Sequence, residues 1–225
     1  MGGLIPLGDV SRRLSRASVI TTCIIVVNAF VFLLELLRGG SFVFTWSAIP
    51  VLIVADHQWI RLITAMFMHS GWLHIIGNMI YLWAFGPEME DAMGRGRYLI
   101  FYFAGGLVSM LAQVLIHPYS QVPILGASGA IAAVMGAFIV TYPRDRIRSI
   151  LFIFIFVRIT FIPAFLLIGF WFLIQLFDAG SITNVRQGGV AYLAHIAGFI
   201  FGAATARFFV YRRRPAGGED WRSDR

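Results

Sequence analysis

Six apolar runs separated by short connections constrain the fold of this chain more than any other feature. The runs predict membrane spans at about 18–37, 69–86, 98–116, 127–142, 159–178 and 190–211. A helix of roughly 20 apolar residues is long enough to cross the hydrocarbon core of a bilayer. The composition agrees, because 59% of the residues are hydrophobic and 13% are charged, against roughly 25% charged residues in soluble domains. We therefore expect an all-α membrane protein whose six-helix bundle occupies residues 18–211.

The arginines predict which side of the membrane each connection faces. All 18 basic residues are arginines, and they outnumber 11 acidic residues, which gives a net charge of +7. Most of them gather at 12–16, 95–97, 144–148 and 207–225, whereas the alternate connections hold only Arg38, Arg61 and Arg186. Arginine-rich loops stay in the cytoplasm. We therefore expect residues 1–17 and the basic tail 212–225 to be cytoplasmic, and we expect no nucleic-acid partner.

Two connecting segments are apolar but are not predicted to cross the membrane. Residues 38–68 are interrupted by Gly39 and Pro50, so we expect a long first loop embedded at the outer interface, since unpaired backbone is unstable in hydrocarbon. Residues 150–163 contain Arg158. We expect this segment to lie at the interface and to lead into the fifth span.

The N-terminal region predicts the location of the protein. The first apolar run has arginines before it and no small-residue cleavage site after it, so we interpret it as a retained span and not as a signal peptide. The short segment before it has no transit peptide, which favours a bacterial plasma membrane. The single cysteine, Cys23, excludes a disulfide framework and a cysteine-based metal site.

Polar side chains within the predicted spans are costly, so each needs a reason, and four of them stand out. Ser128 begins the fourth span and His195 lies near the start of the sixth, so both are roughly 10 Å below the outer surface. Matching depth is what a serine nucleophile and its general base require. His74 and Asn78 in the second span are four residues apart, which puts them on one helical face. Together they can direct N–H donors at one oxygen, as acyl transfer requires.

Each of these residues also has an ordinary structural explanation. A serine in a helix rich in glycine and alanine is usually packing material, and an intramembrane histidine is as often a hydrogen-bond partner or part of a proton path. His74 and Asn78 could simply cross-link helices. The functional hypothesis rests on the coincidence that four rare polar groups share one side of the membrane and a comparable depth.

Three strings carry a resemblance to a known family. HSGWLHIIGNM (69–79), GASGAIAAVMGA (126–137) and AHIAGFIFG (194–202) resemble the signature segments of the rhomboid family of intramembrane serine proteases, in the same order and spacing. The resemblance covers roughly 57–205. It implies that Ser128 is the nucleophile and His195 the general base, in a dyad without an acidic third member. It also implies that His74 and Asn78 line the oxyanion site.

The resemblance extends to two supporting residues and has two departures. Glu90 matches a structural acid that follows the second span, and Arg61 matches the arginine of a Trp-Arg pair in the first loop. Ile60 stands where the family commonly has the tryptophan of that pair. Ala132 stands where many members place an aromatic that stacks on the base, which leaves open what holds the His195 ring.

Small residues predict that the fourth and sixth spans pack closely. Gly198 and Gly202 share one helical face with His195, and Ala132 and Gly136 share one with Ser128. Faces of small residues let two helix backbones approach in lipid. This approach would bring the serine and the histidine within hydrogen-bond distance.

These features together predict an intramembrane serine endopeptidase that cleaves membrane-anchored proteins in or near their transmembrane segment. Its expected partners are transmembrane protein substrates and the lipid bilayer. We expect no cofactor, and no metal, because no cysteine cluster or His/carboxylate set has metal-ligand spacing. The sequence has no H-E-x-x-H zinc motif and no facing pair of intramembrane aspartates, which excludes the other chemistries of intramembrane proteolysis. Two alternatives are an inactive rhomboid-like protein that binds transmembrane segments and, from another class, a small transporter or channel.

Overall fold

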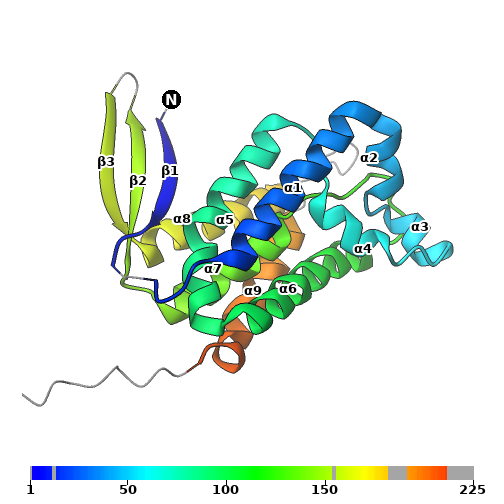
Figure 1. Cartoon of the computed structure of the whole chain (residues 1–225). Helices are drawn as coiled ribbons and strands as arrows, with labels where there is room; N and C mark the ends of the chain where they lie inside the picture. Colours follow the sequence, from blue (N-terminus) through cyan, green and yellow to red (C-terminus); the bar gives the residue numbers. More distant parts are fainter. Residues whose placement is uncertain (1, 12–13, 154–155, 182–191, 212–225) are drawn as a thin grey trace, which may run out of the picture.

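Helices occupy all six predicted positions in the computed structural model, which describes residues 2–11, 14–153, 156–181 and 192–211. The long helices are α1 (Val19–Arg38), α5 (Trp72–Met93), α6 (Arg95–Ile116), α7 (Ser128–Thr141), α8 (Ala164–Ser181) and α9 (Tyr192–Phe209). Figure 1 shows them as one bundle. The predicted tail 212–225 and the first two residues of the sixth predicted span lie outside the described residues.

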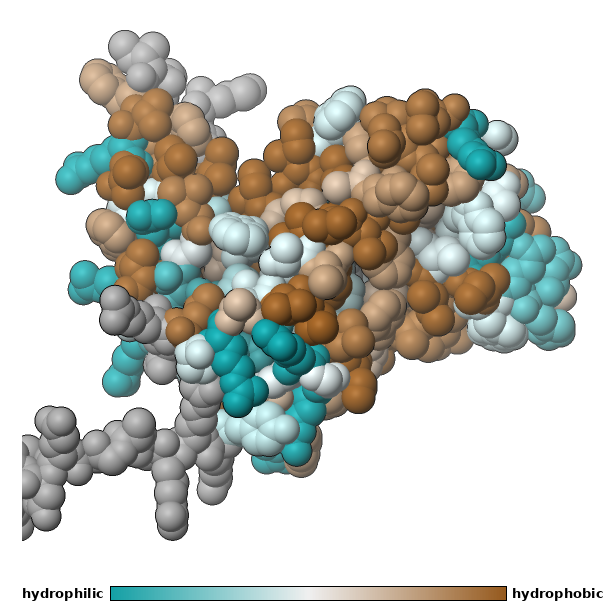
Figure 2. Space-filling model, in the orientation of Figure 1, coloured by the Kyte–Doolittle hydropathy of each residue, from teal (hydrophilic) through white to brown (hydrophobic). Residues whose placement is uncertain are grey.

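The surface of the bundle is apolar. Leu37, Leu73 and Leu115 are exposed, and Figure 2 shows apolar side chains over much of the helical face. In the described part of the chain, three helices are long and apolar enough to cross a membrane, namely α1, α6 and α9. The apolar lengths of α7 and α8 are shorter, and α5 carries three acidic residues near its end. A surface of this kind is stable in lipid and not in water, so the protein is an integral membrane protein.

Helix α7 lies at the centre of the bundle, and its residues from Gly129 to Phe138 are all buried. A side chain added at Gly198 would collide with the carbonyl of Gly129, and one added at Gly202 would collide with the carbonyl of Ala133. Only glycine allows backbones to approach this closely. The predicted close packing of the fourth and sixth helices is therefore confirmed.

The expectation of an all-α fold is wrong in one respect. Among the described residues, β1 (Gly2–Asp9), β2 (Arg146–Ile153) and β3 (Phe156–Pro163) form an antiparallel sheet in the order β1-β2-β3. Residues 150–163, expected as an interfacial segment leading into the fifth span, belong instead to two strands, 150–153 to β2 and 156–163 to β3. Residues 154–155 lie outside the described residues, and α8 begins only at Ala164. The physical reason is composition, since isoleucine, phenylalanine and valine dominate this run and favour strands.

The first loop lies at the other end of the bundle from the sheet (Figure 1). It contains the short helices α2 (Gly40–Trp46), α3 (Pro50–Ala55), α4 (Arg61–Thr64) and the 3₁₀ turn η1 (Ala65–Phe67). The Arg61 guanidinium donates hydrogen bonds to the carbonyls of Phe44 at 2.8 Å and Ser47 at 3.0 Å. These bonds satisfy carbonyls that the end of α2 leaves free, so Arg61 holds the loop in shape.

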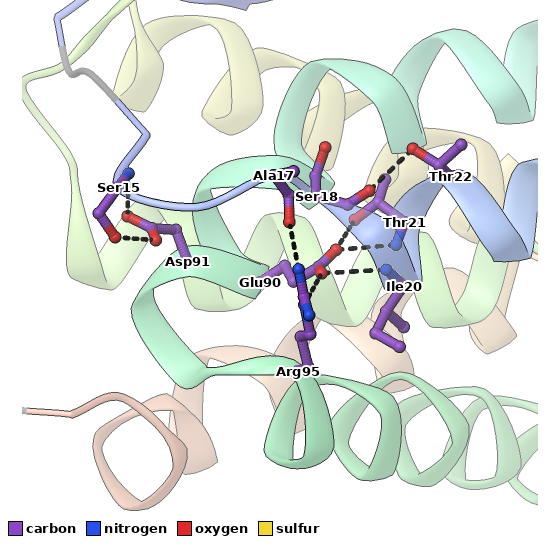
Figure 3. A network of polar contacts seen from close by, with 9 residues as sticks. All are labelled: Ser15, Ala17, Ser18, Ile20, Thr21, Thr22, Glu90, Asp91 and Arg95. Atoms are coloured by element: carbon purple, nitrogen blue, oxygen red, sulfur yellow. Dashed lines mark hydrogen bonds and ion pairs between the residues drawn. The ribbon is translucent and has the colours of Figure 1, made fainter.

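Glu90 of α5 caps the first long helix. Its carboxylate accepts hydrogen bonds from the backbone N–H groups of Ile20 at 3.0 Å and Thr21 at 2.8 Å, and from the Thr21 hydroxyl at 2.9 Å. Figure 3 shows this carboxylate directed at the first turn of α1. The N-cap residue Ser18 makes no side-chain cap, so the acid of a neighbouring helix satisfies these donors instead.

Replacing Glu90 with alanine is expected to lower the free energy of unfolding by about 2–3 kcal/mol, because hydrogen bonds to a charged acceptor are strong and their donors would remain buried. Unfolding of the purified protein in detergent measures this change. Arg95→Gln is the matched control, since Arg95 lies 4.0 Å from the same carboxylate but is 52% exposed. An exposed ion pair contributes under about 1 kcal/mol. Equal losses in the two variants would contradict the capping role.

Candidate active site

The turn before Ser128 shapes the first half of the site. Gly126 has φ +123°, a conformation that side-chain-bearing residues rarely adopt, and its N–H donates to the carbonyl of Ala65 at 2.8 Å. A Cβ at Gly126 would lie 2.8 Å from Nε2 of His74. Glycine is therefore needed both for the turn and for the approach of the His74 ring. Ser128 follows as the first residue of α7, where backbone N–H groups have no partner within the helix.

The structure brings Ser128 and His195 together. Oγ of Ser128 lies 2.7 Å from Nε2 of His195, a distance at which a base can take the hydroxyl proton. His195 is buried within α9. Next to it, the carbonyl of Ala194 accepts a hydrogen bond from the Ser109 hydroxyl of α6 at 2.6 Å, which fixes the start of α9 against the bundle.

His74 of α5 faces the same turn, and its tautomer follows from its neighbours. The backbone N–H of Ser70 donates to Nδ1 of His74 at 3.3 Å. A backbone N–H can only donate, so Nδ1 is the acceptor and a neutral ring carries its proton on Nε2. That nitrogen is the one next to Gly126. His74 can therefore present an N–H donor beside the serine.

Asn78 lies one turn further along α5. It is buried, and among the described residues its Nδ2 has no hydrogen-bond partner. A buried amide donor without a partner is costly, so such a group needs an explanation. An oxygen that arrives only during the reaction would provide one.

The sequence analysis missed Gln175 of α8. Its Oε1 lies 2.7 Å from Nδ1 of His195, and the side chain is only 7% exposed. The signal was present, because Gln175 is a polar residue inside the predicted fifth span. Like Ser128 and His195, it is costly to place within a membrane span.

Two aromatic side chains lie beside the His195 ring. The Trp171 ring of α8 lies 6.0 Å from the His195 ring at an angle of 37°, and the Tyr192 ring lies 6.5 Å away at 90°. Ala132 itself faces α9, because a Cβ at Gly198 would lie 3.5 Å from the Ala132 Cβ. The close approach of α9 thus excludes a large residue at 132, and α8 supplies the aromatic neighbour.

Comparisons with known proteins place the chain in a family. A model of the Rhomboid domain matches residues 56–212, and all four predicted site residues lie inside that match. The chain is 32% identical to rhomboid protease GluP of Bacillus subtilis (strain 168) over 130 residues, which are 56% of this chain and 25% of that protein. It is 27% identical to rhomboid protease GlpG of Yersinia pestis (strain Pestoides F) over 194 residues, which are 85% of this chain and 63% of that protein.

The relatives and the domain model match different shares of the chain. The chain spans less than two thirds of the length of either relative. The domain model, in contrast, covers well over half of this chain and includes α5, α7 and α9, the helices that carry the site. This chain belongs to the rhomboid family.

Proposed function

We propose that the protein is an intramembrane serine endopeptidase, in which Ser128 and His195 cleave a peptide bond of a membrane-anchored substrate. The observation that carries this proposal is the 2.7 Å contact between Oγ of Ser128 and Nε2 of His195 at the start of α7. Family membership supports it. A serine activated by an adjacent histidine is a common nucleophile for acyl transfer.

The reaction proceeds through an acyl-enzyme. Ser128 Oγ attacks the carbonyl carbon of the scissile bond while Nε2 of His195 takes its proton. The same nitrogen then gives the proton to the leaving amine, and the acyl group stays on Ser128. A water molecule, deprotonated by His195, hydrolyses the ester and restores the serine.

The negative charge of each tetrahedral intermediate needs donors in place beforehand. Nε2–H of His74, the Nδ2 group of Asn78 and the backbone N–H of Ser128 supply them. The tautomer set by Ser70 and the lack of another partner for Asn78 among the described residues support this assignment. These donors are buried or half-buried, where a hydrogen bond to a charged oxygen is stronger than in water.

The six long helices serve as six spans of residues 18–211, with both termini in the cytoplasm of a bacterium. The short α7 fits this topology because it is surrounded by other helices and need not match the thickness of the lipid. Substrates are proteins with a transmembrane segment, which reach the serine from the lipid or from the end of the bundle that carries the first loop.

The inactive binder and the transporter are distinguished from the enzyme by one experiment. The purified protein is placed in lipid vesicles with a membrane-anchored reporter and treated with a serine-directed phosphonate, and the adduct is located by mass spectrometry. We expect reporter cleavage, its loss on treatment, and a single adduct at Ser128. An unlabelled Ser128 together with an intact reporter would exclude the protease.

Asn78→Ala is expected to lower kcat about tenfold and to leave KM nearly unchanged. The removed donor acts mainly in the transition state, and single oxyanion donors elsewhere contribute on the order of 3 kcal/mol, here shared with His74 and the backbone. Steady-state cleavage of the reporter measures both constants. Asn28→Ala is the matched control, because Asn28 is a buried asparagine of α1 whose Nδ2 donates to the carbonyl of Ile24. Parental kcat in Asn78→Ala would assign Asn78 to helix packing.

A further inference from the structure

We propose that Gln175 is a positioning residue of this site: its side-chain oxygen holds His195 in the tautomer and orientation that catalysis needs. The inference deepens the proposed function and rests on it. It assigns to a neutral amide of α8 the place that a carboxylate holds in serine proteases with a triad.

The tautomer of His195 follows from the reaction. Nε2 must accept the proton of Ser128, so in the resting neutral ring it carries none and the ring proton lies on Nδ1. An N–H at Nδ1 buried in the bundle needs an acceptor. Oε1 of Gln175 provides it at 2.7 Å. With the other tautomer, Nε2 would carry a proton and could not act as the base.

The orientation of the Gln175 amide is set from its other end. Its Nε2 lies 3.5 Å from the carbonyl oxygen of Trp171, one turn earlier on α8. A carbonyl only accepts, so the NH₂ group faces Trp171 and the oxygen faces His195. A flipped amide would place its oxygen against the carbonyl oxygen of Trp171 and its NH₂ group against the Nδ1–H of His195, so neither end could form a hydrogen bond. The acceptor is thus held in place before a substrate arrives.

Gln175 and Trp171 act on the imidazole from one face of α8. They are four residues apart, the spacing that places side chains on the same side of a helix. Gln175 binds the Nδ1 edge, and the Trp171 ring lies 6.0 Å from the imidazole ring. Two contacts in different directions fix both the tilt and the rotation of the ring. This answers what supports His195 when residue 132 is alanine.

An amide suits this position better than a carboxylate. Gln175 is only 7% exposed. An unpaired charge is expensive to bury in a membrane bundle, whereas an amide with both ends bonded is not. Glutamine therefore fixes the tautomer without placing a charge inside the bundle.

The test compares Gln175→Met, which has a similar shape and no acceptor, with Gln175→Glu, which keeps an acceptor oxygen in either protonation state. Gln113→Met is the matched control, because Gln113 is a half-buried glutamine of α6. Kinetics of reporter cleavage, the unfolding midpoint and the ¹⁵N spectrum of the labelled imidazoles are measured. The spectrum distinguishes the two tautomers without any turnover.

For Gln175→Met we expect a fall in kcat of about tenfold, the equivalent of one neutral hydrogen bond, with KM unchanged and a small fall in the unfolding midpoint that Gln175→Glu recovers. Gln175→Glu should recover most of this loss, and Gln113→Met should match the parent. In the parent, the His195 proton should lie on Nδ1, and in Gln175→Met the signal should show both tautomers.

Parental kcat in Gln175→Met would overturn the inference. So would a loss of kcat that comes with a lower unfolding midpoint when Gln175→Glu recovers neither. A His195 proton on Nε2 in the parent would do the same. Failure of the proposed function looks different, because the parent protein would then leave the reporter intact, or Ser128→Ala would still cleave it.

Discussion

Ser128→Ala and His195→Ala are each expected to abolish cleavage of a membrane-anchored reporter while expression and folding persist. The alanine at 128 removes the nucleophile, and the one at 195 removes the base 2.7 Å away. Removing either member of such a pair elsewhere lowers kcat on the order of a million-fold. The two residues act as one unit, so the double variant should lose no more activity than either single variant.

Reporter cleavage in vesicles and the unfolding midpoint measure this prediction together. Ser41→Ala, at an exposed serine of α2, is a suitable control and should cleave like the parent. Substantial turnover by purified Ser128→Ala protein would remove Ser128 from the mechanism. Additive losses in the double variant would mean that the two residues act separately.

Gly198→Leu is expected to lower activity on the order of 100-fold although residue 198 takes no part in the chemistry. A side chain there would collide with the carbonyl of Gly129 and press on Ala132, so α9 would move away from α7. His195 lies less than one turn earlier on the same helix and would move with it. A displacement of about 1 Å between reacting groups can cost this much.

The measurement again pairs cleavage with the unfolding midpoint. Gly169→Leu on α8 is the matched control, because a Cβ at Gly169 meets nothing within 4 Å and the same substitution there should be tolerated. Ala132→Leu should reproduce the loss from the other side of the contact. Stable insertion of Gly198→Leu with parental cleavage would show that this contact does not hold the dyad.

Much of the fold could be predicted because membrane helices are encoded locally. Each helix needs only its own apolar run, so the six positions and the small residues between α7 and α9 were visible in the sequence. The sheet was not, because β2 pairs with β1 almost at the other end of the chain, and β3 joins the sheet only through β2. A short apolar run also has no period that separates a buried strand from part of a helix.

The site could be predicted for a related reason. Polar groups are costly inside a membrane, which marks Ser128, His195, His74 and Asn78. The predicted topology alone placed Ser128 and His195 at one depth. Gln175 is also a polar group inside a predicted span, but it can contact His195 only if its face of α8 turns toward α9. That orientation is a matter of packing between helices, and a single sequence does not contain it.

The cap on α1 has a consequence for the order in which the protein is assembled. During synthesis α1 leaves the ribosome before α5, and the acid that caps it is 69 residues further along from Thr21. Strand β1 waits longer still, since Ile5 pairs with Ile150. Contacts between distant parts of a chain form late. Strand β1 and α1 are therefore locked in place only after these later segments have been made, and α1 enters the membrane with its leading amides still bonded to water.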